Sequence, residues 1–90
     1  EVFWTEPADA HLAAIHSFLA QTSPRFADRT IDRITARTKQ IAEFQGQAVI
    51  PEAEALEIRM LIEGAYRILY VIGAGHIEVL AVLHGRRGSM

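Results

Sequence analysis

Two β-prone runs late in the chain constrain its fold more than any other feature. Tyr66–Ile72 and Ile77–Leu83 are made almost entirely of aromatic, β-branched and other apolar residues, and Gly73-Ala74-Gly75 joins them. Two such runs with a glycine turn between them predict a β-hairpin. The second run leads into a cationic cluster of His84, Arg86 and Arg87. Imidazole and guanidinium donors suit phosphate or carboxylate groups.

A further strand is expected just before this hairpin. From residue 57, apolar and charged side chains alternate, and Glu63-Gly64-Ala65 then predicts a turn. Alternation of this kind predicts a half-buried strand, with one set of side chains facing the core. The three strands should form an antiparallel meander. The apolar set comprises Ile58, Met60 and Ile62, and the charged set comprises Glu57, Arg59 and Glu63.

Two helices are expected ahead of the meander. Thr5 is a capping residue for the first helix, and Ser23-Pro24 supplies the cap and first position of the second. Gln45-Gly46-Gln47 ends the second helix, and residues 46–56, which include Pro51, are a predicted loop. Apolar side chains recur at helical spacing in both segments. They are Leu12, Ile15 and Leu19 in the first, and Ala27, Ile31, Ile34, Thr38 and Ile41 in the second.

With a short strand at Val2–Thr5, the predicted order of elements is β-α-α-β-β-β. This order describes an α+β domain in which a helical hairpin packs on one face of a small, mainly antiparallel sheet. The length of 90 residues fits one domain over residues 1–90.

Composition excludes several classes of protein. The chain has no cysteine and a formal net charge of −2, which excludes thiolate metal sites and nucleic-acid binding by bulk positive charge. His11 and His16 are five residues apart and do not share a helix face, so we expect no metal site and no cofactor. Neither a membrane-spanning run nor a signal peptide is visible, so we expect a cytoplasmic protein.

The second helix carries four arginines spaced four residues apart, which places them along one side. Such a stripe is typical of a nucleic-acid-binding helix. However, Asp28 lies three residues after Arg25, and Asp32 lies three residues after Arg29. We therefore interpret the stripe as a solvated face with weak ion pairs. The arginines are Arg25, Arg29, Arg33 and Arg37.

The strands carry a second basic group. Tyr66 and Tyr70 share a face, which indicates core packing with the hydroxyl groups at an edge, and Arg67 projects to the opposite side. Arg59 is expected to join Arg67 on the face remote from the helices. Together with His84, Arg86 and Arg87 these side chains would form one basic surface.

Four stretches of the chain together resemble the RelE/ParE superfamily of bacterial type II toxins, and most closely its ParE branch. The resemblance covers nearly the whole chain and includes the order of elements. The stretches are Val2-Phe3-Trp4-Thr5-Glu6-Pro7-Ala8, Ile58-Arg59-Met60-Leu61, Glu63-Gly64-Ala65-Tyr66-Arg67-Ile68-Leu69-Tyr70 and Val79-Leu80-Ala81-Val82-Leu83-His84-Gly85-Arg86-Arg87.

The resemblance implies a non-enzymatic toxin that poisons DNA gyrase by binding it and is neutralised by a cognate ParD-like, ribbon-helix-helix antitoxin. The target-binding or partner-binding residues would be Arg59, Arg67, His84, Arg86 and Arg87. The antitoxin would contact the helical hairpin or the sheet, with Arg29, Arg33, Arg37, Tyr66 and Tyr70 as candidates.

A second mechanism exists in the superfamily, because RelE-like members cleave mRNA on the ribosome. Cleavage needs a base, a cation for the developing phosphorane charge and an acid. Here Glu57 would be the base, Arg59 or Arg67 the cation and His84 the acid. Ribonuclease relatives usually carry a tyrosine or a denser basic set at this end, and this chain has one lysine, Lys39. A third interpretation is a non-toxic module that only binds an antitoxin.

Overall fold

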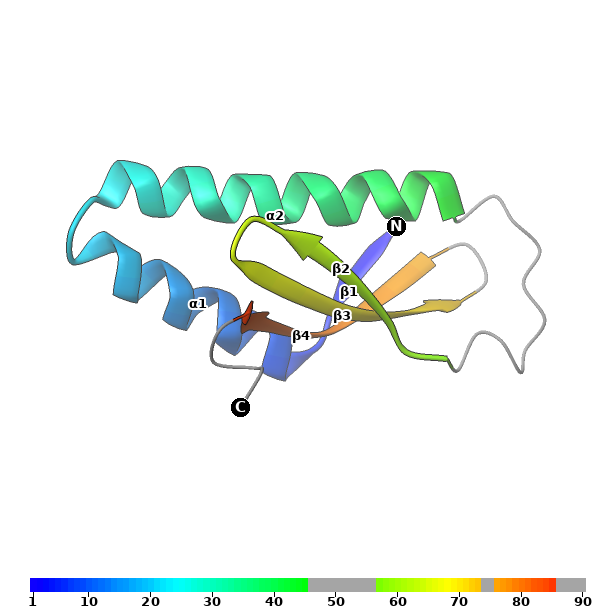
Figure 1. Cartoon of the computed structure of the whole chain (residues 1–90). Helices are drawn as coiled ribbons and strands as arrows, with labels where there is room; N and C mark the ends of the chain where they lie inside the picture. The colour runs from blue at the N-terminus through cyan, green and yellow to red at the C-terminus, as the bar shows by residue number, and fades with distance from the viewer. Residues whose placement is uncertain (46–56, 74–75, 86–90) are drawn as a thin grey trace.

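Two helices form a hairpin that packs across one face of a four-stranded sheet (Figure 1). The computed structural model describes residues 1–45, 57–73 and 76–85. The predicted order β-α-α-β-β-β and the α+β class are confirmed. The elements are β1 (Val2–Trp4), α1 (Glu6–Ala20), α2 (Pro24–Gln45), β2 (Arg59–Glu63), β3 (Tyr66–Gly73) and β4 (His76–His84).

Both helices begin at the predicted capping residues. The Thr5 hydroxyl accepts a hydrogen bond from the Ala8 N–H at 3.3 Å, and the Ser23 hydroxyl accepts one from the Phe26 N–H at 3.2 Å. These bonds satisfy N–H groups that have no partner within the helix. Thr5 also donates to the Val79 carbonyl oxygen at 2.8 Å, so the start of α1 is tied directly to β4.

The sheet has the strand order β1-β4-β3-β2. Strands β2, β3 and β4 form the predicted antiparallel meander. Strand β1 lies parallel to β4, with Val2 opposite Ile77, so the first and last strands of the described chain are neighbours. A register shift follows Leu69 in the β3–β4 pair.

The core lies between the helices and the face of the sheet that they cover, which we term the inner face. Ile68 and Ile72 of β3, Ile77 of β4 and Ile34 of α2 are each at most 1% exposed. Alternation along the strands places these side chains on one side. The opposite side, which neither α1 nor α2 covers, is termed the outer face.

Strand β2 turns its apolar residues the opposite way from the prediction. Met60 and Ile62 are 51% and 60% exposed. The alternate residues belong to the inner face; they are Arg59, Leu61 and Glu63. Leu61 lies opposite buried Ile68. The Glu63 carboxylate forms an ion pair with the Arg37 guanidinium group of α2 at 3.2 Å. A shift of one residue exchanges the two faces of a strand. The ion pair with α2 and the packing of Leu61 favour the observed choice.

The same arrangement corrects the prediction that Arg59 and Arg67 share a face. Arg59 lies opposite Tyr70, which is 7% exposed and part of the core. Arg67 lies opposite Ile62 and Leu83 on the outer face. The two guanidinium groups are therefore on opposite sides of the sheet.

A side chain from α1 completes the edge of β4 beyond the end of β1. The backbone N–H of Val82 donates to Nδ1 of His11 at 3.1 Å. Because Nδ1 is the acceptor in this bond, the proton of the neutral ring resides on Nε2. His11 thus serves a structural role between α1 and β4. Among the described residues, no helix has the length and apolar character needed to cross a bilayer.

Candidate functional site

A hollow of about 500 Å³ lies at the turn between β2 and β3, and we term it the sheet-end hollow. Gly64 forms the turn with a φ of 60°, in the left-handed region that favours glycine. The Gly85 N–H donates to the Ala65 carbonyl oxygen at 2.7 Å, which brings the end of β4 back onto the turn. The lining residues are Ile62, Gly64, Ala65, Tyr66, Arg67, His84 and Gly85.

Gly85 allows the chain to pass close to a guanidinium group. A Cβ atom at this position would lie 3.1 Å from the Ala65 carbonyl oxygen and 3.6 Å from Nε of Arg67. A side chain would therefore crowd the turn. Because Gly85 has no side chain, Arg67 and His84 can both line the sheet-end hollow, although their strand positions face opposite sides of the sheet.

Tyr66 and His84 form the wall of this hollow. Their rings pack edge to face, with centroids 5.5 Å apart and planes at 89°, an arrangement favoured by the charge distribution of aromatic rings. Both side chains are half-buried. The predicted face of Tyr66 is confirmed, and the pair positions the imidazole at the end of the sheet.

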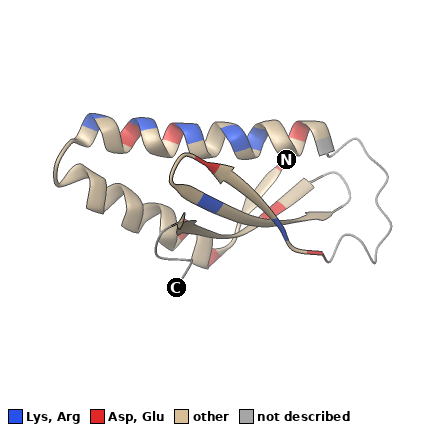
Figure 2. Ribbon diagram, in the orientation of Figure 1, with Lys and Arg blue, Asp and Glu red and all other residues tan. Residues whose placement is uncertain are grey.

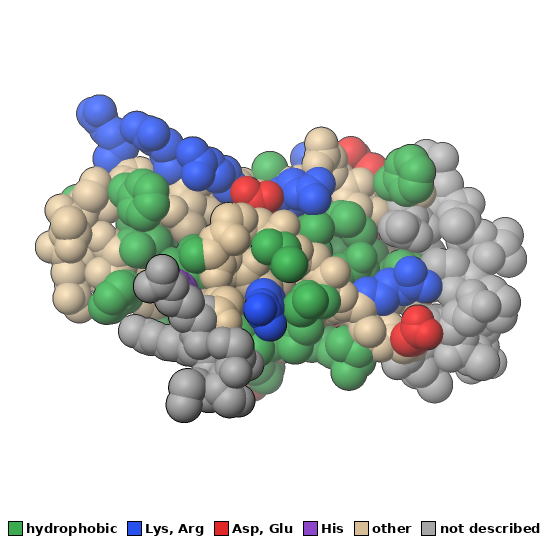
Figure 3. Space-filling view, viewed as in Figure 1, with side chains coloured by type: hydrophobic (Ala, Val, Ile, Leu, Met, Phe, Trp, Pro, Cys, Tyr) green, Lys and Arg blue, Asp and Glu red, His purple; other side chains and the backbone are tan. Residues whose placement is uncertain are grey.

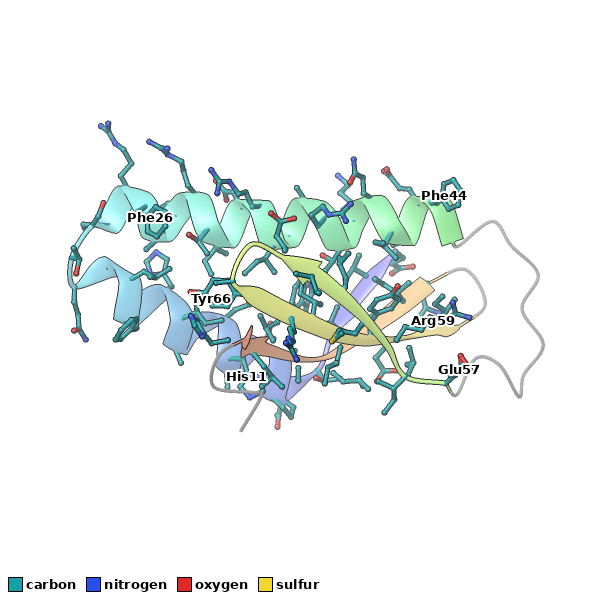
Figure 4. All side chains as sticks on the ribbon, viewed as in Figure 1. His11, Phe26, Phe44, Glu57, Arg59 and Tyr66 are labelled. Atoms are coloured by element: carbon teal, nitrogen blue, oxygen red, sulfur yellow. The ribbon has the colours of Figure 1, made fainter. Side chains whose placement is uncertain are left out.

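A second hollow, of about 350 Å³, lies on the other side of this aromatic pair and is termed the helix-hairpin hollow. Leu19 of α1 and Phe26 and Ile34 of α2 give it an apolar lining. Phe26 is half exposed, and Figure 4 shows it at the same end of the molecule as Tyr66. The remaining lining residues are Thr30, Arg33, Glu63, Gly64, Ala65, Tyr66 and His84.

The residues proposed for RNA cleavage do not meet at one place. Arg59 pairs with Tyr70, four residues along β3 from Tyr66, which corresponds to about 13 Å. Glu57 is exposed and precedes Arg59 by two residues, so it lies still farther from His84. Figure 4 shows Glu57 and Arg59 at the end of the sheet opposite Tyr66. Arg67 and His84 therefore share a hollow without the proposed base.

Arg59 is embedded in the inner face rather than on a binding surface. Its Nε atom is buried and has no hydrogen-bond partner among the described residues. An unsatisfied buried donor costs about 1–3 kcal/mol. Arg59 thus lies half-buried on the inner face, and its guanidinium group does not extend the basic surface around Arg67.

The arginines of α2 do not pair with the acids on their own helix. Asp28 binds His16 of α1 at 2.8 Å, and Arg37 binds Glu63 of β2. Within the described part of the chain no ion pair neutralises Arg25, Arg29 or Arg33. The predicted weak ion pairs of these arginines with Asp28 and Asp32 are therefore wrong. We term these three residues the arginine ridge. Basic side chains line α2 in Figures 2 and 3.

The remaining candidate binding residues are Tyr70, Arg86 and Arg87. Tyr70 is in the core, and little of its surface is open to a partner. Arg86 and Arg87 lie outside the described residues. Among the described side chains no group of three or more His, Asp or Glu residues is arranged to hold a metal ion.

Sequence reasoning missed the helix-hairpin hollow, although one signal for it was present. Phe26 lies about 100° around the helix from the neighbouring core residue Ala27, so it projects beside the buried stripe rather than within it. A large aromatic residue at such a boundary position is partly exposed at 50%. It thereby contributes to the apolar lining of the helix-hairpin hollow.

Comparison with known proteins agrees with this architecture. Residues 2–88 match the family described as the ParE toxin of the type II toxin–antitoxin system parDE. A relative from Caulobacter vibrioides, Toxin RelE2, is 28% identical over 87 residues, which cover 97% of each chain.

A solved structure described as the chromosomal ParDE TA system from P. aeruginosa has the same fold, with a TM-score of 0.71 and 21% identity. The match covers 93% of this chain and 94% of that one. The fold, the family match over nearly the full length and the order of elements lead to one conclusion. The chain belongs to the ParE toxin family of type II toxin–antitoxin systems.

Proposed function

We propose that this toxin inhibits growth by binding DNA gyrase, without breaking a bond itself, and that a ParD-like antitoxin neutralises it. The observation that carries the proposal is the separation of Glu57 and Arg59 from His84 along the sheet. General acid–base cleavage requires its groups within hydrogen-bond reach of one scissile bond. A binding mechanism requires only a shaped and charged surface.

The sheet-end hollow is the proposed target-binding surface. Arg67 supplies a guanidinium group, His84 an imidazole, and Tyr66 an aromatic edge beside them. Arginine and tyrosine are enriched among residues that dominate binding energy. Arg86 and Arg87 follow directly in the sequence and would add positive charge for an acidic patch on the target.

The helix-hairpin hollow and the arginine ridge are the proposed antitoxin-binding surface. The hollow accepts apolar side chains between Leu19 and Phe26, while Arg29 and Arg33 are exposed on α2 and have no acidic partner among the residues that the structure describes. An amphipathic segment with apolar anchors and acidic residues satisfies both features. A ribbon-helix-helix antitoxin with an acidic tail is the expected partner.

A supercoiling assay with purified toxin and gyrase tests the target. We expect wild-type toxin to block supercoiling and Arg67→Ala and His84→Ala to weaken the block. Lys39→Ala, a change on exposed α2 surface remote from the sheet-end hollow, is the matched control and should inhibit like wild type. Unchanged gyrase activity at saturating toxin would overturn the proposal.

One arrangement favours a second candidate, a RelE-like ribosome-dependent endoribonuclease. Arg67 and His84 line the same hollow, so a cation and an acid–base group are close together. A relative of the chain also carries the name Toxin RelE2. If the wild-type toxin cleaves mRNA in a translation mixture and the His84→Ala variant does not, the result supports this candidate. Intact mRNA with the wild-type toxin would reject it.

Growth on induction of the toxin without its antitoxin separates both candidates from an inert binding module. Arrest supports a toxin that acts on some target. Normal growth with folded, abundant protein would favour a module that only binds antitoxin.

A further inference from the structure

The outer face of the sheet is apolar, and no helix within the described residues covers it. Phe3 of β1, Met60 and Ile62 of β2 and Leu83 of β4 are all exposed, and Leu69 of β3 lies opposite Met60. Figure 3 shows hydrophobic side chains gathered around a basic side chain over the strands. Contiguous exposed apolar surface on a soluble protein marks an interaction site.

Two charged residues interrupt this apolar face, and they have opposite signs. Arg67 lies between Ile62 and Leu83 across the neighbouring strands, whereas Glu78 lies between Phe3 and Val71. Both side chains are half-buried. In the described residues neither belongs to an ion pair. Among the described residues the charges of this face therefore balance, with a cation at one end and an anion at the other.

We propose that two copies of this chain associate through their outer faces. Glu78 is in register with Val71, which lies four residues, or about 13 Å, along β3 from Arg67. A two-fold axis in the plane of the interface, perpendicular to the line that joins Arg67 to Glu78, exchanges the positions of these two residues between the copies. Arg67 of each copy then lies over Glu78 of its partner, and both ion pairs form in a self-complementary interface.

The charge balance favours a second copy over an acidic antitoxin segment at this face. An acidic segment gains most from surplus positive charge, which the arginine ridge on α2 offers. On the outer face the same segment would bring negative charge towards Glu78, and like charges at an interface are strongly unfavourable. A surface with one cation and one anion in this spacing instead complements itself.

The size of the face predicts weak association. Strands spaced about 4.8 Å apart and about six residues long give on the order of 400 Å² of sheet per copy. Two such faces bury less than the roughly 1,200 Å² typical of stable complexes. We therefore expect reversible dimers with a dissociation constant in the micromolar range, and not a permanent assembly.

Sedimentation velocity of the purified full chain over micromolar to sub-millimolar concentrations tests the association. Wild type should shift from monomer to dimer as concentration rises. Ile62→Glu, which places a charge in the apolar area, should weaken the dimer at least about tenfold because it desolvates an unpaired carboxylate. Phe44→Glu changes an exposed aromatic on α2 and should dimerise like wild type. A monomer at every concentration, or a dimer indifferent to Ile62→Glu, would overturn the proposal.

A charge exchange tests the two-fold arrangement independently. Arg67→Glu and Glu78→Arg should each weaken the dimer, because each places like charges opposite one another. The double variant should restore dimer formation, since both ion pairs re-form with reversed signs. Failure of the double variant to recover rejects this geometry. If Ile62→Glu loses its cooperative melting transition, the charge exchange decides the question alone.

Discussion

Both faces of the sheet are apolar, yet the inner face is buried and the outer face is exposed to solvent. On the inner face, Ile68 and Ile72 are fully buried under the helices. On the outer face, Met60 and Ile62 are more than half exposed. Burial is thus decided by which face the helical hairpin covers and not by apolar content. Among the described residues no helix covers the outer face, so its apolar side chains stay exposed.

The largest difference between the two faces should appear in core truncations. Ile34→Ala removes a side chain that is 0% exposed between α2 and the inner face, and should lower the free energy of unfolding by about 2–4 kcal/mol through loss of burial and a residual cavity. Ile62→Ala, on the outer face, should change it by less than about 0.5 kcal/mol. Urea denaturation of both variants measures the contrast. Equal losses would mean that both faces are packed.

The link between α1 and β4 should have the next largest effect. His11→Ala leaves the Val82 N–H without its acceptor, and an unsatisfied buried donor costs about 1–3 kcal/mol. His16→Ala removes only an exposed ion pair with Asp28, worth less than about 1 kcal/mol. Thermal and chemical denaturation of the two variants compare them. If His16→Ala were the more destabilising, the role assigned to His11 would be wrong.

A smaller effect, of opposite sign, distinguishes the arginines on the two faces. Arg59→Met replaces the buried, unpartnered Nε with a methyl group and keeps an apolar side chain up to that position, so it should raise the free energy of unfolding by about 1 kcal/mol. Arg67→Met, on the outer face, should leave it nearly unchanged. A loss of stability in Arg59→Met would show that its guanidinium group has an essential partner.

The smallest expected effect on stability belongs to Arg67→Ala, at about 0.5 kcal/mol or less. Its consequence for binding should nevertheless be clear, because Arg67 lies at the sheet-end hollow and on the outer face. Titration of gyrase with the variant should show several-fold weaker inhibition at an unchanged melting temperature. A large drop in melting temperature would assign Arg67 to the fold and not to recognition.

Most of the fold was predictable because local signals agreed with one another. Thr5 and Ser23 cap the helices as expected, and the glycine turn at Gly64 joins β2 to β3. The orientation of β2 was not predictable from alternation alone. Ile58, Met60 and Ile62 form the more apolar set, but the inner face is selected by contacts distant in sequence, which include the packing of Leu61 against the core and the Glu63 ion pair with Arg37.

The candidate site was predictable only in part. Arg67 and His84 were identified from sequence and do line one hollow, because the closing residues of β4 pair with the start of β3. Arg59 was grouped with them wrongly, since the side on which a strand residue lies depends on register and packing. The role of Asp28 was also misassigned, because its partner, His16, lies on the other helix.

The parallel pairing of β1 with β4 has a consequence for how the toxin is made. Strand β4 is synthesised after all the other described elements, yet it lies inside the sheet between β1 and β3. It supplies Ile77, Val79 and Val82 to the core, and without it β1 has no neighbour. A nascent chain interrupted before β4 therefore lacks both a continuous sheet and half of its strand core. Pairing over such a long sequence separation is also slow. The four-stranded sheet can therefore be completed only after β4 has been synthesised.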